Sequence, residues 1–256
     1  MTHIMRRGKH SPQQASGGRL RFWGKHAVIA AIANPERTIR HIWGTHEAVA
    51  ALGLSSDIPT TFAQASDLGR MVPNDAPHQG LVADVDPLPE LWLEDLLVTG
   101  AGDERPLLVL DSVTDPHNVG AILRSAAAFD ALGIITQDRH APPESGALAK
   151  AASGMLEIVP WVRVVNLSRA LEQIAEAGFW RIGLAGEGKR TLGEAMGKAR
   201  LCLVMGAEGE GIRQNVAGHC DEIARLPISP QVESLNVSNA AAIALYAAAA
   251  RPKEDV

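Results

Sequence analysis

Short apolar runs alternate with longer helical stretches from residue 107 almost to the end of the chain, and this alternation constrains the fold most strongly. Short apolar runs separated by helices indicate a parallel sheet covered on both faces. The candidate strands are Leu107–Leu110, Gly133–Thr136, Ile158–Val162, Arg181–Leu184, Leu201–Met205 and Ile223–Leu226. An alanine-rich helix, roughly Leu235–Ala250, follows the last of them. We therefore predict an α/β domain over residues 107–256.

The charges are unevenly distributed along the chain. Residues 1–50 contain 8 Lys/Arg and 2 Asp/Glu, whereas the other 206 residues contain 16 and 27. A basic end on an acidic body is expected where that end meets a polyanion such as RNA or DNA. The alternative for residues 1–18 is a flexible, solvated basic tail.

Residues 19–86 are predicted to form a second, smaller α/β unit. A helix over His26–Ala33 stops at Asn34-Pro35, because proline disfavours helix at the residue before it. The other expected elements are a strand at Ile39–Trp43, a helix at Glu47–Leu52, a strand at Pro59–Phe62, a helix near Ser66–Met71 and a strand at Gly80–Val85. Three strands give a small core, which we expect to need support from the rest of the chain or from RNA. Residues 87–106 are predicted to be a linker.

The composition excludes several classes of protein. No apolar run approaches the roughly 18 residues of a membrane-spanning helix, and the N-terminus lacks the apolar centre of a signal peptide. The two cysteines cannot form a disulfide framework or, alone, a metal cluster. We expect a soluble cytoplasmic protein with no membrane segment and no metal.

A glycine-rich segment, Gly183-Leu-Ala-Gly-Glu-Gly-Lys-Arg-Thr191, resembles a phosphate-binding P-loop. A P-loop requires Ser or Thr after the lysine, because that hydroxyl binds magnesium, and Arg190 stands there instead. We therefore interpret this segment as a glycine-rich turn rather than a nucleotide site.

Two other strand exits carry polar residues where parallel sheets bind ligands. After the strand ending at Leu110, a polar loop leads into a helix with Asn118 at its start, and Arg124 lies off the apolar stripe of that helix. After Met205 comes the turn Gly206-Ala-Glu-Gly-Glu-Gly211, whose glycines allow close backbone approach to a ligand or another chain. Taken separately, these residues also fit a helix cap, a surface arginine and a solvated turn.

Three ordered motifs together resemble one family. Residues 111–125, the turn Gly206–Gly211, and Ser234-Leu-Asn-Val-Ser238 are similar to the motifs of the SpoU/TrmH RNA ribose 2′-O-methyltransferases. The N-terminal unit, with Gly24-Lys-His26 and His78-Gln-Gly-Leu-Val-Ala-Asp84, resembles the ribosomal-protein-like substrate-binding domain of the RlmB-like branch. The resemblance implies a trefoil-knotted SPOUT methyltransferase domain, a homodimer formed through it, and S-adenosylmethionine as cofactor.

The same resemblance implies roles for individual residues. It places the cofactor at Gly206, Leu226 and Leu235, with Leu184 and Ala185 lining the site, and the catalytic group at Asn118, Arg124, Glu208, Ser234 and Asn236. Because the methyl group of a sulfonium is already activated, the reaction needs no metal and no covalent nucleophile. A guanidinium has a pKa above ~12, so we expect Arg124 to bind a phosphate and stabilise the developing alkoxide rather than act as a base.

The expected function is 2′-O-methylation of a ribose, that of a guanosine, in large-subunit rRNA. Two alternatives within the family are a tRNA guanosine methyltransferase and an rRNA methyltransferase that confers thiopeptide resistance. A non-catalytic rRNA-binding assembly factor is the alternative from another class, and the presence of Asn118, Arg124, Glu208 and Asn236 argues against it.

Overall fold

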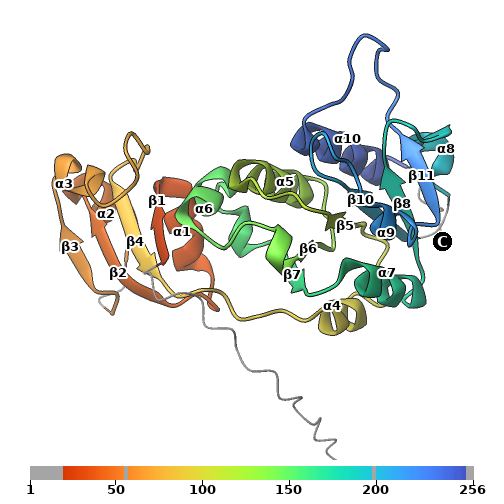
Figure 1. Cartoon of the computed structure of the whole chain (residues 1–256). Coiled ribbons are helices and arrows are strands. Elements are labelled where there is room, and N and C mark those ends of the chain that lie inside the picture. Colours follow the sequence, from red (N-terminus) through yellow and green to blue (C-terminus); the bar gives the residue numbers. More distant parts are fainter. Residues whose placement is uncertain (1–19, 55–56, 198–199, 252–256) are drawn as a thin grey trace, which may run out of the picture.

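The computed structural model describes residues 20–54, 57–197 and 200–251, so the expected basic tail over residues 1–18 lies outside the described residues. The chain forms a small four-stranded sheet and a seven-stranded sheet, which lie at opposite ends of an elongated molecule (Figure 1). We call the part built on the small sheet the head. Among the described residues, no helix is long and apolar enough to cross a membrane.

The seven-stranded sheet is parallel throughout, as the alternating apolar runs predict. Its strand order is β7-β6-β5-β10-β8-β11-β9. The strands are β5 (Leu107–Leu110), β6 (Gly133–Gln137), β7 (Trp161–Val164), β8 (Phe179–Leu184), β9 (Arg190–Thr191), β10 (Arg200–Met205) and β11 (Glu222–Arg225).

Two details of the prediction for this sheet are corrected. The strand expected over Ile158–Val162 begins only at Trp161, because a 3-10 turn over Met155–Glu157 and then Pro160 occupy the preceding residues. The two-residue edge strand β9 was not predicted, since it is defined only by its pairing with β11.

Helices cover both faces of this sheet. The alternation within β5 separates the faces, because Leu108 and Leu110 join one apolar core while Leu107 and Val109 join another. The first face packs against α5 (Pro116–Ala128), α6 (Gly146–Ala152), α8 (Leu192–Ala195) and α10 (Val237–Ala249). The second packs against α4 (Leu93–Thr99), α7 (Leu167–Glu176) and α9 (Gln214–Ala217).

The head contains four strands rather than the three expected. Their order is β1-β4-β2-β3, with β2 and β3 parallel and the other pairs antiparallel. The elements are β1 (Leu20–Trp23), α1 (Lys25–Ala33), β2 (Ile39–Gly44), α2 (His46–Ala50), β3 (Thr60–Phe62), α3 (Ala65–Gly69) and β4 (Leu81–Val85). The additional strand β1 is only four residues long and follows directly on residues that the structure does not describe.

The head shares its main core with the larger part of the chain. Phe22 and Val28 of the head belong to the same buried cluster as Leu148 and Leu156. The support expected for its small core therefore comes from the rest of the chain. Within the predicted linker, α4 buries Leu93 and Leu96 in the second core.

Candidate active site

The site lies where neighbouring strands of the large sheet end. Met205, the last residue of β10, is in register with Leu110 on one side and Leu184 on the other, so β5, β10 and β8 end in one row. β11 ends beside them, since Ala224 pairs with Leu184. Ligands bind beyond the carboxyl ends of strands in such sheets. The loops that follow these strands carry most of the residues predicted from the sequence.

Three of the five predicted catalytic residues form one hydrogen-bonded cluster, although they are far apart in sequence. The Asn236 side chain donates to Asn118 Oδ1 at 3.0 Å and to Glu208 Oε1 at 2.5 Å. Asn118 Nδ2 donates to the same Glu208 oxygen at 3.3 Å, and the backbone N–H of Val237 does so at 3.2 Å. Glu208 Oε1 therefore accepts three N–H groups and fixes both amides relative to each other.

Helix starts hold the two amides in place. Asp115 caps α5 by accepting the backbone N–H of His117 at 2.9 Å, which sets Asn118 in the first turn. Asn236 itself caps α10, its Oδ1 accepting the backbone N–H of Ser238 at 3.0 Å. Because Oδ1 faces the helix, Nδ2 must face the cluster. The carboxylate of Glu208 lies at the N-terminus of α10, where the helix dipole favours negative charge.

The glycine-rich turn after β10 requires glycine for steric reasons. A Cβ on Gly206 would lie 2.0–2.2 Å from backbone atoms of Gly211, and the two residues cannot move apart because Gly211 donates to Ala207 O at 2.9 Å. Gly209 and Gly211 have φ values of 82° and 68°, a region that other residues rarely adopt. The turn is therefore folded tightly on itself and carries Glu208 on its outer side.

An ion pair that the sequence did not reveal fixes the far end of this turn. Asp111, fully buried at the exit of β5, accepts the backbone N–H of Arg213 at 2.9 Å and its Nε at 2.7 Å. Arg213 also donates to Gln137 Oε1 at 2.6 Å. A charged residue directly after a buried strand was the available signal for Asp111. Its partner, 102 residues later, carried none.

The other two predicted catalytic residues lie outside the cluster. Arg124 is exposed on α5, and Ser234 is exposed in the loop before α10. Neither side chain forms a hydrogen bond or an ion pair with any residue that the structure describes. Arg124 is therefore a cation available to a ligand, and its role is not defined by protein contacts.

The predicted cofactor residues surround the same strand ends. Gly206 and Ala185 follow directly on the paired residues Met205 and Leu184, and Ala185 donates to Ala224 O at 3.0 Å. Leu184, Leu226 and Leu235 are half-buried, so each leaves part of an apolar side chain accessible. Backbone groups beside accessible apolar surface fit a small amphipathic cofactor such as S-adenosylmethionine.

The donor set does not favour metal or thiolate chemistry. No group of three His, Cys, Asp or Glu side chains arranged to hold a metal occurs in the described part of the chain. Burial raises the pKa of Cys220 to about 11 and that of Cys202 further still, so neither is a thiolate at neutral pH. What remains is a carboxylate, two oriented amides and a free arginine, a set that can orient a hydroxyl group and bind a phosphate.

Comparison with known proteins agrees with this geometry. Residues 105–246 match the model of the SpoU rRNA Methylase family, and residues 22–91 match a model described as RNA 2′-O ribose methyltransferase substrate binding. The chain is 38% identical over 237 residues to the 23S rRNA (guanosine-2′-O-)-methyltransferase RlmB of Pseudomonas syringae, covering 89% of this chain and 94% of that one.

Two solved structures share the fold. One is a putative RNA methyltransferase of the TrmH family from Porphyromonas gingivalis, with a TM-score of 0.72 and 28% identity over 89% of this chain and 88% of that one. The other is an AdoMet-bound rRNA methyltransferase from Sinorhizobium meliloti, with a TM-score of 0.76 and 23% identity over 90% and 86%. The family model matches more than half of the chain, and the match to RlmB covers most of it. This chain therefore belongs to the SpoU rRNA methylase family.

Proposed function

We propose that this enzyme transfers a methyl group from S-adenosylmethionine to the ribose 2′-hydroxyl of a guanosine in large-subunit rRNA. The observation that carries the proposal is the Asn118–Glu208–Asn236 cluster beside the Gly206–Gly211 turn at the strand ends. Relatives named as 23S rRNA guanosine-2′-O-methyltransferases, 36–38% identical over most of the chain, support the choice of substrate. An rRNA substrate also implies that the enzyme works in the cytoplasm.

In this proposal, each residue has a positioning or charge-stabilising task. S-adenosylmethionine supplies a methyl group that its sulfonium already activates, and Gly206, Leu226, Leu235, Leu184 and Ala185 hold it. The amides of Asn118 and Asn236 orient the ribose hydroxyl towards the methyl carbon, and holding the two reactants in line provides much of the rate enhancement.

Arg124 binds the adjacent phosphate and stabilises the negative charge that develops on the ribose oxygen. Its exposure and its lack of a partner among the described residues leave its guanidinium available for this task. Ser234 stays a predicted member of the site, in the loop that leads to Asn236.

The trefoil knot and the homodimer belong to the same proposal. In the order β5-β10-β8-β11-β9, the last two strands of the sequence, β10 and β11, each lie between two strands that precede them in the chain. A threaded chain requires such insertions. A Cβ on Gly188 would lie 2.4 Å from the backbone of Ala224, so the segment before β9 is packed tightly against β11. Exposed Ile243 and Tyr246 on α10 supply apolar surface for a second subunit.

Transfer of a tritiated methyl group tests the function. The full chain is incubated with labelled S-adenosylmethionine and either deproteinised large-subunit rRNA or bulk tRNA. The proposal expects label in the rRNA and its loss in Arg124→Ala, with cofactor affinity measured by calorimetry unchanged. Label in tRNA alone would favour the tRNA alternative, and cofactor-independent rRNA binding without any transfer would favour the assembly factor.

A further inference from the structure

One lysine joins the methyltransferase part of the chain to the head. Lys150 of α6 donates through Nζ to Gln79 Oε1 at 2.9 Å, and the same oxygen accepts the backbone N–H of Lys25 at 3.1 Å. A Cβ on Gly24 would lie 2.4 Å from Lys150 Nζ, so the lysine side chain lies directly against the backbone of the head. We call Lys25, Gln79 and Lys150 the seam cluster.

Lys150 lacks a counter-charge. Partial burial lowers the pKa of Lys150, and the lysine forms no ion pair within the described part of the chain. Arg37, elsewhere between the same two units, is fully buried but lies 2.8 Å from Glu157 and 2.6 Å from Glu144. One buried cation between the units is thus neutralised, whereas Lys150 has only an amide oxygen. A partly dehydrated cation without a carboxylate favours an external anion.

Two more donors of the seam cluster are free. The Lys25 side chain is exposed and without a partner among the described residues, and Gln79 Nε2 has no acceptor there. Because Gln79 Oε1 already accepts two N–H groups, its Nε2 must point away from them. Two ammonium groups and an amide donor are a donor set suited to one phosphate group.

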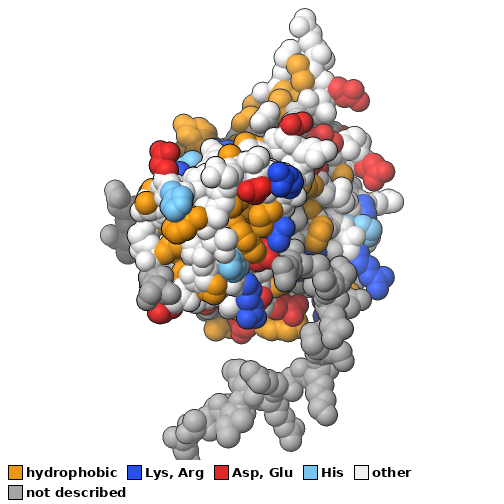
Figure 2. Space-filling model, turned by 90° about the vertical axis from the view of Figure 1, so that its left-hand side faces the viewer, with side chains coloured by type: hydrophobic (Ala, Val, Ile, Leu, Met, Phe, Trp, Pro, Cys, Tyr) orange, Lys and Arg blue, Asp and Glu red, His pale blue; other side chains and the backbone are white. Residues whose placement is uncertain are grey.

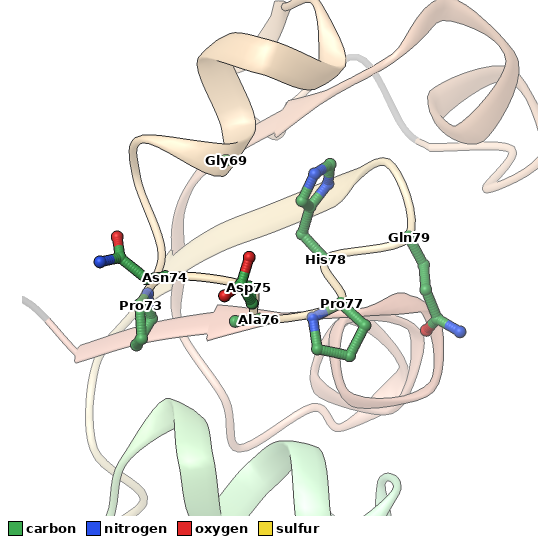
Figure 3. Close-up of a pocket in the computed structure, with 8 residues that line it drawn as sticks. All are labelled: Gly69, Pro73, Asn74, Asp75, Ala76, Pro77, His78 and Gln79. Atoms are coloured by element: carbon green, nitrogen blue, oxygen red, sulfur yellow. The ribbon is translucent and has the colours of Figure 1, made fainter.

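The loop that carries Gln79 is strained and borders a groove. Gln79 has a φ of 53° and Asp75 a φ of 61°, values that cost energy for residues other than glycine and that cluster at binding sites. The loop lines an open groove of about 590 Å³ together with Gly69, the loop itself contributing residues 73–79. In Figure 3 the side chains of His78 and Gln79 extend from the loop in opposite directions, so Gln79 points away from His78.

The seam cluster lies close to the candidate active site. α6 packs on α5 so closely that a Cβ on Gly120 would lie 2.4 Å from Ala151 Cβ, and Gly120 is two residues from Asn118. α6 also contacts α1, which begins at Lys25. The packed helices α1, α6 and α5 thus carry Lys25, Lys150 and Arg124, three cations without a carboxylate partner in the described part of the chain.

We propose that Lys25, Gln79 and Lys150 bind a backbone phosphate of the RNA substrate and so hold the strand between the head and the active site. The proposal rests on the proposed function, because it takes an RNA as the ligand. It adds a positioning site that exists only while the head packs against α6, because Lys25 and Gln79 belong to the head and Lys150 belongs to α6. Two ammonium groups favour a charged phosphate over a neutral base edge, so the site is expected to contact the backbone.

Three variants of the full chain separate phosphate binding from a merely structural contact. Lys150→Met removes the charge and keeps an unbranched side chain, whereas Lys150→Arg keeps the charge. Gln79→Glu supplies Lys150 with a carboxylate, which strengthens the seam but repels a phosphate. Arg169→Met on α7 is the matched control, because Arg169 is exposed, unpaired among the described residues, and on the other side of the sheet.

The dissociation constant for a large-subunit rRNA transcript is measured against salt concentration. One lost phosphate contact should weaken binding about 5–8-fold near 0.1 M salt and lower the log–log salt slope by about one. We expect this for Lys150→Met and Gln79→Glu, with substantial recovery in Lys150→Arg, unchanged cofactor affinity and an equal or higher melting temperature for Gln79→Glu.

Wild-type RNA affinity and salt slope in both Lys150→Met and Gln79→Glu would overturn the proposal. So would an equal loss of RNA affinity in Arg169→Met. Loss of affinity in Lys150→Met alone, with a lowered melting temperature and normal binding by Gln79→Glu, would show a structural contact only. Failure of the proposed function is a different result, namely wild-type enzyme that transfers no methyl group to rRNA.

Discussion

Replacing Asp111 by Asn should destabilise the protein and loosen the glycine-rich turn together. The carboxylate of Asp111 is fully buried and accepts N–H groups from the backbone and the guanidinium of Arg213. Asparagine keeps the volume but removes the charge, and its amide cannot accept all of these donors. The turn that carries Glu208 then loses the anchor at its far end.

The magnitude follows from the burial of the two partners. Removing one member of a buried ion pair costs about 3–5 kcal/mol, but the Arg213 side chain is 33% exposed and recovers part of its hydration. We therefore expect a loss of about 2–3 kcal/mol in the free energy of unfolding. At about 2–4 °C per kcal/mol for a chain of this size, the melting temperature should fall by roughly 4–12 °C.

Thermal unfolding and calorimetric titration with S-adenosylmethionine measure the two effects. Asp103→Asn is the control, since its pair with Arg105 is more exposed, at 26% and 42%, and should contribute at most about 1 kcal/mol. The variant Asp111→Asn should also bind the cofactor more weakly, whereas the control should not. A melting temperature no lower than that of the control, with normal cofactor affinity, would refute the anchoring role of Asp111.

Three further changes have defined outcomes. Arg37→Met should cost about 3–5 kcal/mol in unfolding experiments, because the buried Glu157 would lose its cationic partner and keep the neutral amide of Asn34. Asn236→Ala should cost about 1 kcal/mol through loss of the cap on α10 and should also abolish most methyl transfer in a single-turnover assay. Burial raises the pKa of Glu144, so its contribution to stability is present in acid and is lost as pH rises through the folded pKa. Glu144→Gln should therefore equal or exceed the wild-type melting temperature at pH 7, with an advantage that shrinks towards pH 4.

Each of these expectations has an opposing result. If Arg37→Met lost no more free energy of unfolding than removal of an exposed ion pair does, Glu157 would be satisfied by its other partners or by water. Normal turnover in Asn236→Ala would remove that amide from the reaction and leave it as a cap. The opposing result for Glu144→Gln is a melting temperature below that of wild type at pH 7, with a smaller deficit at pH 4. It would show that the ion pair with Arg37 outweighs the cost of burying the carboxyl group.

Local sequence patterns predicted the large sheet because its central strands β5, β6 and β10 are buried, mainly apolar runs. They could not predict β9, since two residues of an edge strand carry no pattern and only pairing with β11 defines them. The short β1, which completes the head sheet, was missed for a similar reason.

The candidate site was predictable only in part from its residues. Asn118, Glu208 and Asn236 each fit an ordinary cap or turn, and only the ordered motifs suggested that they act together. The structure adds the hydrogen bonds that join them across 90 and 118 residues of sequence. The pairs Asp111–Arg213 and Lys150–Gln79 also span long stretches of sequence, 102 and 71 residues, and no local periodicity specifies such partners.

Nucleoside analysis of rRNA treated with the enzyme and methyl-labelled S-adenosylmethionine tests the central claim most directly. The rRNA is digested completely, and the labelled nucleosides are separated and identified by mass spectrometry. We expect the label in 2′-O-methylguanosine alone, and far less of it with the Asn236→Ala variant. Label on a base, on several different nucleosides, or none at all with wild-type enzyme would contradict the assignment of this cluster to ribose methylation.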